Sequence, residues 1–163
     1  MTIRTYDHGR DWEALWRMKR AFERELGSGT GTDTKQARYE GKLTDAYRER
    51  YRAWVERCLD DDPDCIQLAV ADSEAMGYAF VLPESHAMIW DAGVLNELYL
   101  AHTRRGEGLA DDLMAAAMEV VRGQSLPMDR LVLDVDPDNS RARAFYDRHG
   151  FEPWGELVVR RLE

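Results

Sequence analysis

Two glycines and two arginines lie close together in the segment from Leu98 to Ala110, which reads LYLAHTRRGEGLA. Its apolar start, polar middle and second apolar run predict a strand, a turn and the beginning of a helix. Gly106 and Gly108 can adopt backbone conformations closed to other residues, and they let a ligand approach the main chain. The start of a helix adds unpaired N–H groups and the positive end of a dipole, which suits a pyrophosphate. The alternative is a plain surface loop before a helix whose dipole is complemented by Asp111 and Asp112.

A second segment with chemical potential runs from Asp136 to Phe151 and reads DPDNSRARAFYDRHGF. Asn139 offers a side-chain amide to a ligand, but an Asn at this place is also what a helix N-cap requires. The phenol of Tyr146 has an ordinary pKa of about 10, so it is a hydrogen-bond donor at neutral pH. Its alternative role is that of a core aromatic ring paired with Phe145.

Together the two segments resemble the GNAT family of N-acetyltransferases. Residues 105–110 (RGEGLA) match the family's pyrophosphate pattern of Gln or Arg, two variable residues, Gly, one variable residue, then Gly or Ala. The resemblance is close from Leu95 to the C-terminus and covers the earlier part only as topology. The later motif of the family is matched, at the same spacings, by Asn139, Ala142, Phe145, Tyr146, Gly150 and Phe151.

The resemblance implies acetyl-CoA as the acyl donor and no metal. Main-chain groups of Leu98 and Leu100 would align the pantetheine arm as an added strand would, and the amides of residues 105–111 would hold the pyrophosphate. Asn139 would hydrogen-bond the coenzyme arm, and Tyr146 would donate a proton to the leaving thiolate. The implied coenzyme-binding residues are Leu98, Tyr99, Leu100, Arg105, Gly106, Glu107, Gly108, Leu109, Ala110, Asp111, Asn139 and Tyr146.

Glu97 is the candidate general base, and Tyr146 and Glu97 are thus the two expected catalytic residues. An alkylammonium must lose a proton before it attacks, and a carboxylate acting directly or through water contributes typically ~10²- to 10⁴-fold to such a step. Strand alternation places Leu95, Glu97 and Tyr99 on one face, opposite Leu98, so the carboxylate can point into a cleft beside the thioester. The alternative is that Glu97 lies on an exposed strand face, with its carboxylate in solvent and no catalytic role.

The N-terminal part of the chain has two helical patterns. From Asp11 onward apolar residues recur at intervals of three and four residues, which predicts a helix. Gly27 is expected to be its C-cap. The glycine-rich run 27–32 lacks the following Lys-Ser/Thr pair of a phosphate-binding loop, so we interpret it as a flexible loop. A second helix is expected from Lys35 to Cys58, ending before the acidic turn at Asp60.

The remaining patterns predict a hairpin with its turn at residues 72–76, a helix over Leu109–Arg122 and a helix over Ser140–His149 stopped by Gly150. The resemblance implies an α+β, GNAT-type acyl-CoA N-acyltransferase fold, with a central mixed β-sheet of about six or seven strands flanked by helices. Strands are expected at Ile3–Tyr6, Cys65–Ala71, Gly77–Leu82, Val94–Leu100, Leu131–Val135 and Leu157–Leu162.

Composition limits the class of protein. A chain of 163 residues with 44% hydrophobic residues suits one domain over 1–163. The charge of −9 argues against a nucleic-acid partner and fits a cationic substrate. Two cysteines are too few for a disulfide framework, and Cys58 and Cys65 do not have the spacing of a zinc site. We therefore interpret both as ordinary thiols. Without an apolar run of about 18 residues or a secretory signal, a cytoplasmic protein with no membrane partner is expected.

The resemblance implies an acetyl-CoA-dependent N-acetyltransferase that moves acetyl directly onto a primary amine of a small-molecule or peptidyl acceptor. The charge of −9 leads us to expect a cationic acceptor. The acceptor's identity and a homodimeric state stay open. A non-catalytic acyl-CoA-binding sensor or interaction module of the same fold is the alternative, because a fold does not guarantee a function. Action on aminoacyl-tRNA is a weaker reading, since it calls for a basic surface.

Overall fold

The computed structural model describes residues 1–28, 37–38 and 40–162. The described part contains two short 3-10 helices, η1 (Glu84–His86) and η2 (His102–Arg104). In chain order the others are β1 (Thr2–Thr5), α1 (His8–Ser28), α3 (Asp45–Asp61), β2 (Ile66–Ala71), β3 (Glu74–Val81), β4 (Gly93–Leu100), α4 (Leu109–Arg122), β5 (Leu131–Val132) and α5 (Ser140–Arg148).

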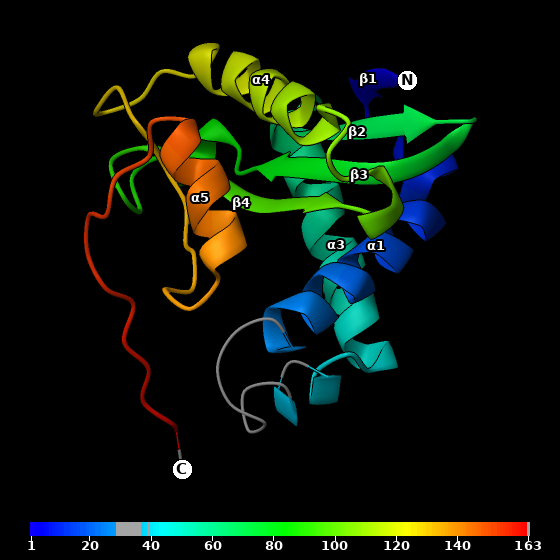
Figure 1. The fold of residues 1–163 in the computed structure, drawn as a ribbon, viewed down its shortest axis with the longest axis horizontal. Coiled ribbons are helices and arrows are strands. Elements are labelled where there is room, and N and C mark those ends of the chain that lie inside the picture. The colour runs from blue at the N-terminus through cyan, green and yellow to red at the C-terminus, as the bar shows by residue number, and fades with distance from the viewer. Residues whose placement is uncertain (29–36, 39, 163) are drawn as a thin grey trace.

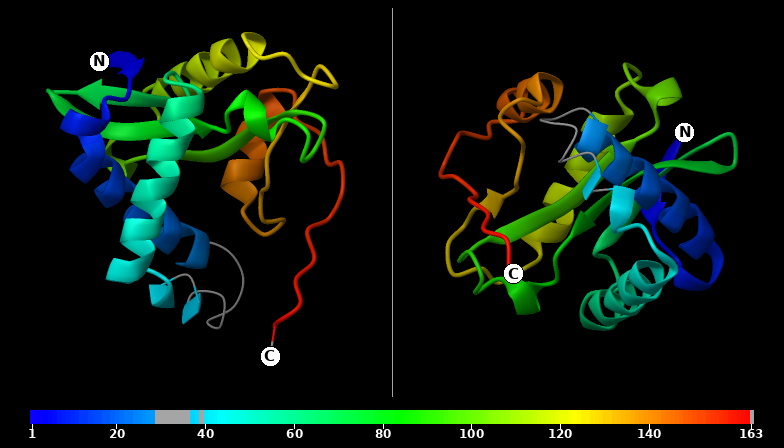
Figure 2. Two further views of the ribbon diagram at one scale, coloured as in Figure 1. Left: turned by 180° about the vertical axis from the view of Figure 1, so that it is seen from behind. Right: turned by 90° about the horizontal axis from the view of Figure 1, so that it is seen from below.

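The strands form one mixed sheet in the order β1-β2-β3-β4-β5. The first four strands are antiparallel to their neighbours, and β5 pairs with β4 in parallel. Helices α1 and α3 cover one face of the sheet and α4 covers the other (Figures 1 and 2). The predicted α+β class with a mixed sheet flanked by helices is confirmed.

The β2–β3 hairpin turns more tightly than the sequence suggests. Asp72 and Ser73 have φ of 52° and 64°, and β3 already begins at Glu74. Positive φ at both central residues is the pattern of a two-residue hairpin turn whose twist matches the strands. The predicted turn at residues 72–76 was therefore too long, because three of its residues belong to the strand.

The two N-terminal helices differ from prediction at their ends. Helix α1 continues through Gly27 to Ser28, so Gly27 is not its C-cap, and residues 29–32 of the predicted loop lie outside the described part. Helix α3 begins at Asp45 instead of Lys35, because the Thr44 side chain caps it by accepting a hydrogen bond from the Tyr47 amide. It runs to Asp61, through the first acidic residues that were expected to end it.

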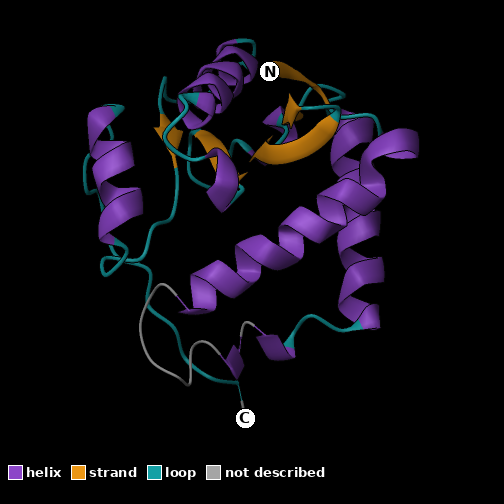
Figure 3. Cartoon of the chain, turned by 45° about the vertical axis from the view of Figure 1, so that its right-hand side comes forward, coloured by secondary structure: helices purple, strands orange, loops and turns teal. Residues whose placement is uncertain are grey.

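The C-terminal part of the sheet is shorter than predicted. Of the expected strand at 131–135 only Leu131 and Val132 pair with β4, and the expected strand Leu157–Leu162 is absent among the described residues. That segment runs away from the sheet (Figures 1 and 3), and its apolar side chains are exposed. The described sheet thus has five strands, not six or seven. An alternating pattern becomes a strand only when a neighbouring edge pairs with it.

Both cysteines, Cys58 and Cys65, are free thiols, and both lie in the core, inaccessible to solvent. Burial raises the pKa of the Cys58 thiol to about 12 and that of Cys65 above its usual range, so both stay protonated at neutral pH. In the described part of the chain no helix is long and apolar enough to cross a membrane, and no group of His, Cys, Asp or Glu could hold a metal ion.

Candidate functional site

The turn between β4 and α4 has the backbone that the two glycines were expected to allow. Gly106 has φ of +87° and Gly108 has φ of +82°, a region that other residues rarely adopt. A Cβ atom at either position would meet no heavy atom within 4 Å. The glycines are therefore required by backbone conformation, and the space beside them is open to a ligand.

The amides that follow these glycines have no acceptor within the helix. Gly108 is the N-cap of α4 without a capping side chain, and the first bond of the helix runs from the Asp112 amide to the Gly108 carbonyl. The amides of residues 109–111 are thus unpaired at the positive end of the dipole. The Arg105 amide, which was expected to join them, instead donates to the His102 carbonyl at 3.3 Å.

The side chain of Arg105 braces this turn. Its guanidinium donates to both carboxylate oxygens of Glu25 at 2.8 and 2.9 Å and to the Leu100 carbonyl at 2.8 Å. It therefore ties the end of α1 to the end of β4, and its charge is already compensated. Sequence reasoning missed Glu25, because the partners lie 80 residues apart.

The edge of β4 that faces β5 is mostly unpaired. Among the described residues, β5 pairs with β4 only at Gly93 and Val94. The β5-facing main-chain groups from Leu95 to Leu100 have no strand beside them, because the two strands part there. An exposed strand edge of this kind can pair with an extended ligand.

A bulge in β4 changes the faces predicted for its side chains. Phe80 pairs with Glu97, but the next residue of β3 pairs with Leu95, so Asn96 is the extra residue. Leu95 then packs against α4 together with Leu98, while Glu97 turns toward α1 and α3. The prediction that Leu95 and Glu97 share a face was wrong, because bulges shift the alternation and often re-aim a side chain beside an active site.

Glu97 is buried, with only 5% of its surface exposed. Its carboxylate accepts hydrogen bonds from Lys19 Nζ at 2.7 Å, from the Tyr51 hydroxyl at 2.7 Å and from the Tyr78 hydroxyl at 2.9 Å. Burial, and then the nearby Glu97 charge, raise the pKa of both phenols well above its usual range, so both remain donors. The charge of Glu97 is not displayed to bulk solvent.

Lys19 is the partner of Glu97 that was hardest to predict from the sequence. It lies in the apolar stripe of α1 and is 4% exposed. Burial alone would lower the pKa of this ammonium, but the carboxylates of Glu97 and Glu23 outweigh burial and raise it. A charged residue inside an apolar stripe was the available signal, since buried charges are normally paired.

Tyr146 belongs to the α4 side of the sheet. Its ring lies between Phe145 and Phe151 at 5.4 and 5.6 Å, and it packs against the core cluster that also contacts Leu98. Burial raises the pKa of the phenol to about 12, which keeps its proton in place at neutral pH. Among the described groups none accepts a hydrogen bond from its hydroxyl.

Helix α5 has the capping interactions that were considered as alternatives. The Asn139 side-chain oxygen accepts from the Ala142 amide at 3.1 Å, which makes Asn139 the N-cap. The NH2 group of the same side chain can still donate to a ligand acceptor. Asp111 of α4 contacts Arg148 and His149 at 2.8 and 2.7 Å. These contacts hold the Tyr146 helix against the start of α4.

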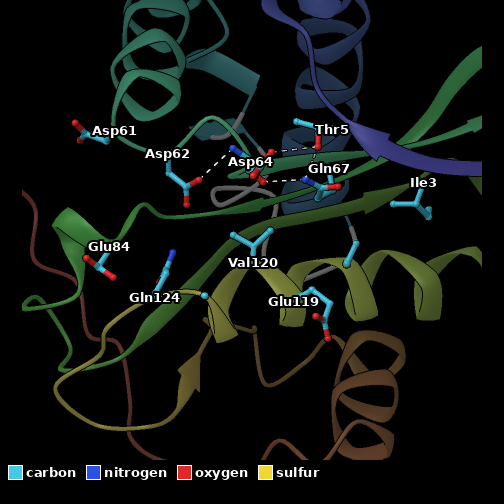
Figure 4. A pocket seen from close by; sticks show the side chains of 12 residues that line it. Ile3, Thr5, Asp61, Asp62, Asp64, Gln67, Glu84, Glu119, Val120 and Gln124 are labelled. Atoms are coloured by element: carbon cyan, nitrogen blue, oxygen red, sulfur yellow. Dashed lines mark hydrogen bonds between the residues drawn. The ribbon is translucent and has the colours of Figure 1, made fainter.

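A separate groove of about 720 Å³ lies toward the other end of α4 (Figure 4). None of the predicted site residues lines it. Carboxylates from several elements face it, namely those of Asp61, Asp62, Asp64, Glu84 and Glu119.

Sequence comparison places these features in a known family. A profile of the acetyltransferase (GNAT) family matches residues 30–151, which is most of the chain. The chain belongs to the GNAT family. The GNAT match includes the bulged strand, the glycine turn and the Tyr146 helix described above.

This GNAT chain resembles a sequence relative and several solved structures. A mycothiol acetyltransferase from Acidothermus cellulolyticus is 29% identical over 171 residues, covering 96% of this chain but only 46% of that protein. This chain thus spans less than half the length of that relative. The PaiA N-acetyltransferase of Thermoplasma acidophilum in complex with coenzyme A has a TM-score of 0.69 at 20% identity, over 93% of this chain and 89% of that one. A ribosomal-protein-alanine N-acetyltransferase from Brucella melitensis has a TM-score of 0.69 at 22% identity, over 95% and 86%.

Proposed function

We propose that this protein transfers the acetyl group of acetyl-CoA directly onto a primary amine of a small-molecule or peptidyl acceptor. One observation carries the proposal, which is the unpaired amides of residues 109–111 behind Gly106 and Gly108, beside an unpaired edge of β4. A helix start of this kind binds pyrophosphate, and the strand edge suits the pantetheine arm. Family membership supports it, as does a coenzyme A complex of a protein with the same fold.

In the proposed reaction the acceptor ammonium first loses a proton to Glu97, directly or through water. The neutral amine attacks the thioester carbonyl carbon, and the tetrahedral intermediate then breaks its C–S bond. The phenol of Tyr146 gives its proton to the departing sulfur, and the proton that the acetylated nitrogen then loses returns to the phenolate through water. The products are the N-acetylated amine and the free thiol of coenzyme A, and Glu97 releases the first proton to solvent. No covalent intermediate with the protein forms.

The acceptor is proposed to be cationic, because the chain carries a charge of −9. Long-range attraction of a cation weakens with salt, as the Debye length falls to about 8 Å at physiological ionic strength. In a panel of cationic, neutral and anionic amines tested with acetyl-CoA, we expect the cations to release thiol fastest and their kcat/KM to fall with added salt. A neutral or anionic best acceptor would contradict the electrostatic argument.

Substitution of Glu97 by Gln tests the proposed base. Gln keeps the shape and removes the charge and the basicity, so turnover should fall by about 10²-fold or more near neutral pH and by less at high pH, where more amine is already deprotonated. The measurement is a pH–rate profile with the best acceptor, with exposed Glu119→Gln as a control for charge loss elsewhere. Parallel profiles with equal rates for Glu97→Gln and the native protein would remove Glu97 from the mechanism.

The non-catalytic alternative shares the coenzyme site but needs no proton transfer. In that case acetyl-CoA binds and no amine is acetylated, whichever acceptor is offered. The presence of both Tyr146 and Glu97 favours the enzyme, because a binding module needs neither a proton donor nor a proton acceptor. Detection of an acetylated amine decides between the two functions.

A further inference from the structure

A short chain of alternating charges is buried between the sheet and the N-terminal helices. Lys19 Nζ lies 2.7 Å from a carboxylate oxygen of Glu97 and 2.5 Å from one of Glu23, and the second oxygen of Glu23 lies 2.8 Å from Lys42 Nζ. The side chains of Lys19, Glu23 and Glu97 are at most 5% exposed. Removing charges from water often costs more than their attraction returns, so such a cluster is a poor source of stability.

The geometry around Lys19 fixes its ammonium in one place. The Nζ atom lies 4.9 Å from the centre of the Tyr51 ring and 5.4 Å from that of Phe22, which adds cation–π attraction to its two ion pairs. Tyr51 also donates its hydroxyl to Glu97. The same phenol therefore contacts both members of the ion pair.

The two oxygens of the Glu97 carboxylate have different partners. One accepts from the hydroxyls of Tyr51 and Tyr78, and the other accepts from Lys19. Lys19 is the only ammonium among the described residues that is ion-paired with Glu97. Because it is shared with Glu23, its charge compensates only part of that of Glu97.

We propose that Lys19 is a positioning residue for acyl transfer, which holds the carboxylate of Glu97 ionised and in one orientation while Glu23 limits how strongly it does so. The inference rests on the proposed role of Glu97 as proton acceptor. An ionised carboxylate is required to accept a proton, and a carboxylate bound too tightly by a cation is a weak base. Lys19 is shared between the two carboxylates, so Glu97 and Glu23 compete for the same ammonium.

The polar surroundings of Glu97 come from every element packed against it. On its own strand Asn96 lies 3.4 Å away through its side-chain amide. The other titratable or charged groups are Lys19 and Glu23 of α1, Tyr47, Tyr51 and Cys58 of α3, Tyr78 of β3, and Lys42 through Glu23.

Two substitutions should move the pH dependence of kcat/KM in opposite directions. Lys19→Met removes the cation, so protonation of Glu97 becomes easier and the acidic limb should move up by about one pH unit or more, a tenfold loss at a pH on the limb. In Glu23→Gln the Lys19 ammonium is ion-paired with Glu97 alone, so the acidic limb should move to lower pH. Lys19→Arg retains the charge and should keep the limb near its native position. The acceptor's own ionisation is the same in each protein.

A purely structural role gives a different pattern. Loosened packing would lower kcat/KM at every pH, and any movement of the acidic limb would have the same direction in Lys19→Met and Glu23→Gln. Either result would overturn the proposal. If Lys19→Met does not fold, as judged by its melting transition, Glu23→Gln decides alone, because an unmoved or raised limb contradicts the inference.

A second measurement does not require an acceptor. Infrared difference spectra follow the protonated carboxyl band of Glu97 with pH, and the band is assigned by its loss in Glu97→Gln. The pH at which half of this band has appeared, its midpoint, should be higher in Lys19→Met and lower in Glu23→Gln than in the native protein. If Glu97→Gln leaves catalysis unchanged, the proposed base is wrong. If Glu97→Gln abolishes the acidic limb while Lys19→Met leaves limb and midpoint in place, only the role of Lys19 is wrong.

Discussion

In Gly108→Trp, acetyl-CoA is expected to leave the melting temperature unchanged, whereas it should raise that of the native protein by several degrees. A ligand at about 100 times its Kd stabilises a folded protein by about 2.7 kcal/mol, or roughly 5–10 °C for a chain of this size. The indole fills open space beside the unpaired amides of α4, and φ of +82° is strained for any residue with a side chain. Binding should therefore be lost.

The matched control is Gly155→Trp, which adds the same bulk at another open position, away from the turn. It should retain the native shift with acetyl-CoA. The melting curve of unliganded Gly108→Trp reports whether the domain is folded, so loss of binding can be told from loss of structure. A full shift in folded Gly108→Trp would show that the pyrophosphate binds elsewhere.

Replacing Tyr146 by Phe should reduce turnover by 10²-fold or more, because general acid catalysis contributes typically ~10²- to 10⁴-fold. The ring contacts with Phe145 and Phe151 are kept, so affinity for acetyl-CoA should stay near native. A fall in kcat without a change in binding is the signature of a group that acts in the transition state. Steady-state kinetics and acetyl-CoA titration measure both.

Tyr6→Phe is the control for this substitution. Its buried phenol contacts His8 at the start of α1 and no predicted site residue, so its loss should leave turnover near native. Turnover of Tyr146→Phe within a factor of about two of native would assign Tyr146 a packing role only.

The glycine turn and the two helix starts could be predicted from the sequence, because these features are local. A glycine turn followed by a helix start is a matter of adjacent residues, and the predicted bounds of the helix Leu109–Arg122 were correct. The same holds for the N-cap at Asn139, which the sequence offered as the alternative to a ligand contact.

The other half of the candidate site depends on contacts that no local pattern contains. The partners of Glu97 come from α1, α3 and β3, and Lys19 lies 78 residues away in sequence. The bulge at Asn96 depends on how β3 and β4 pair, so regular alternation assigned Leu95 to the wrong face. The segment Leu157–Leu162 failed as a strand for a related reason, since its pattern cannot specify a partner edge.

Single-turnover transfer tests the central claim most directly. The protein is mixed with acetyl-CoA labelled in the acetyl group and the best amine of the panel, and samples are quenched in time. The account predicts that labelled N-acetylated amine and free coenzyme A thiol appear at the same rate, with no labelled protein. Binding of acetyl-CoA without transfer to any amine would contradict an enzymatic role, and labelled protein that forms and decays before the product would contradict direct transfer.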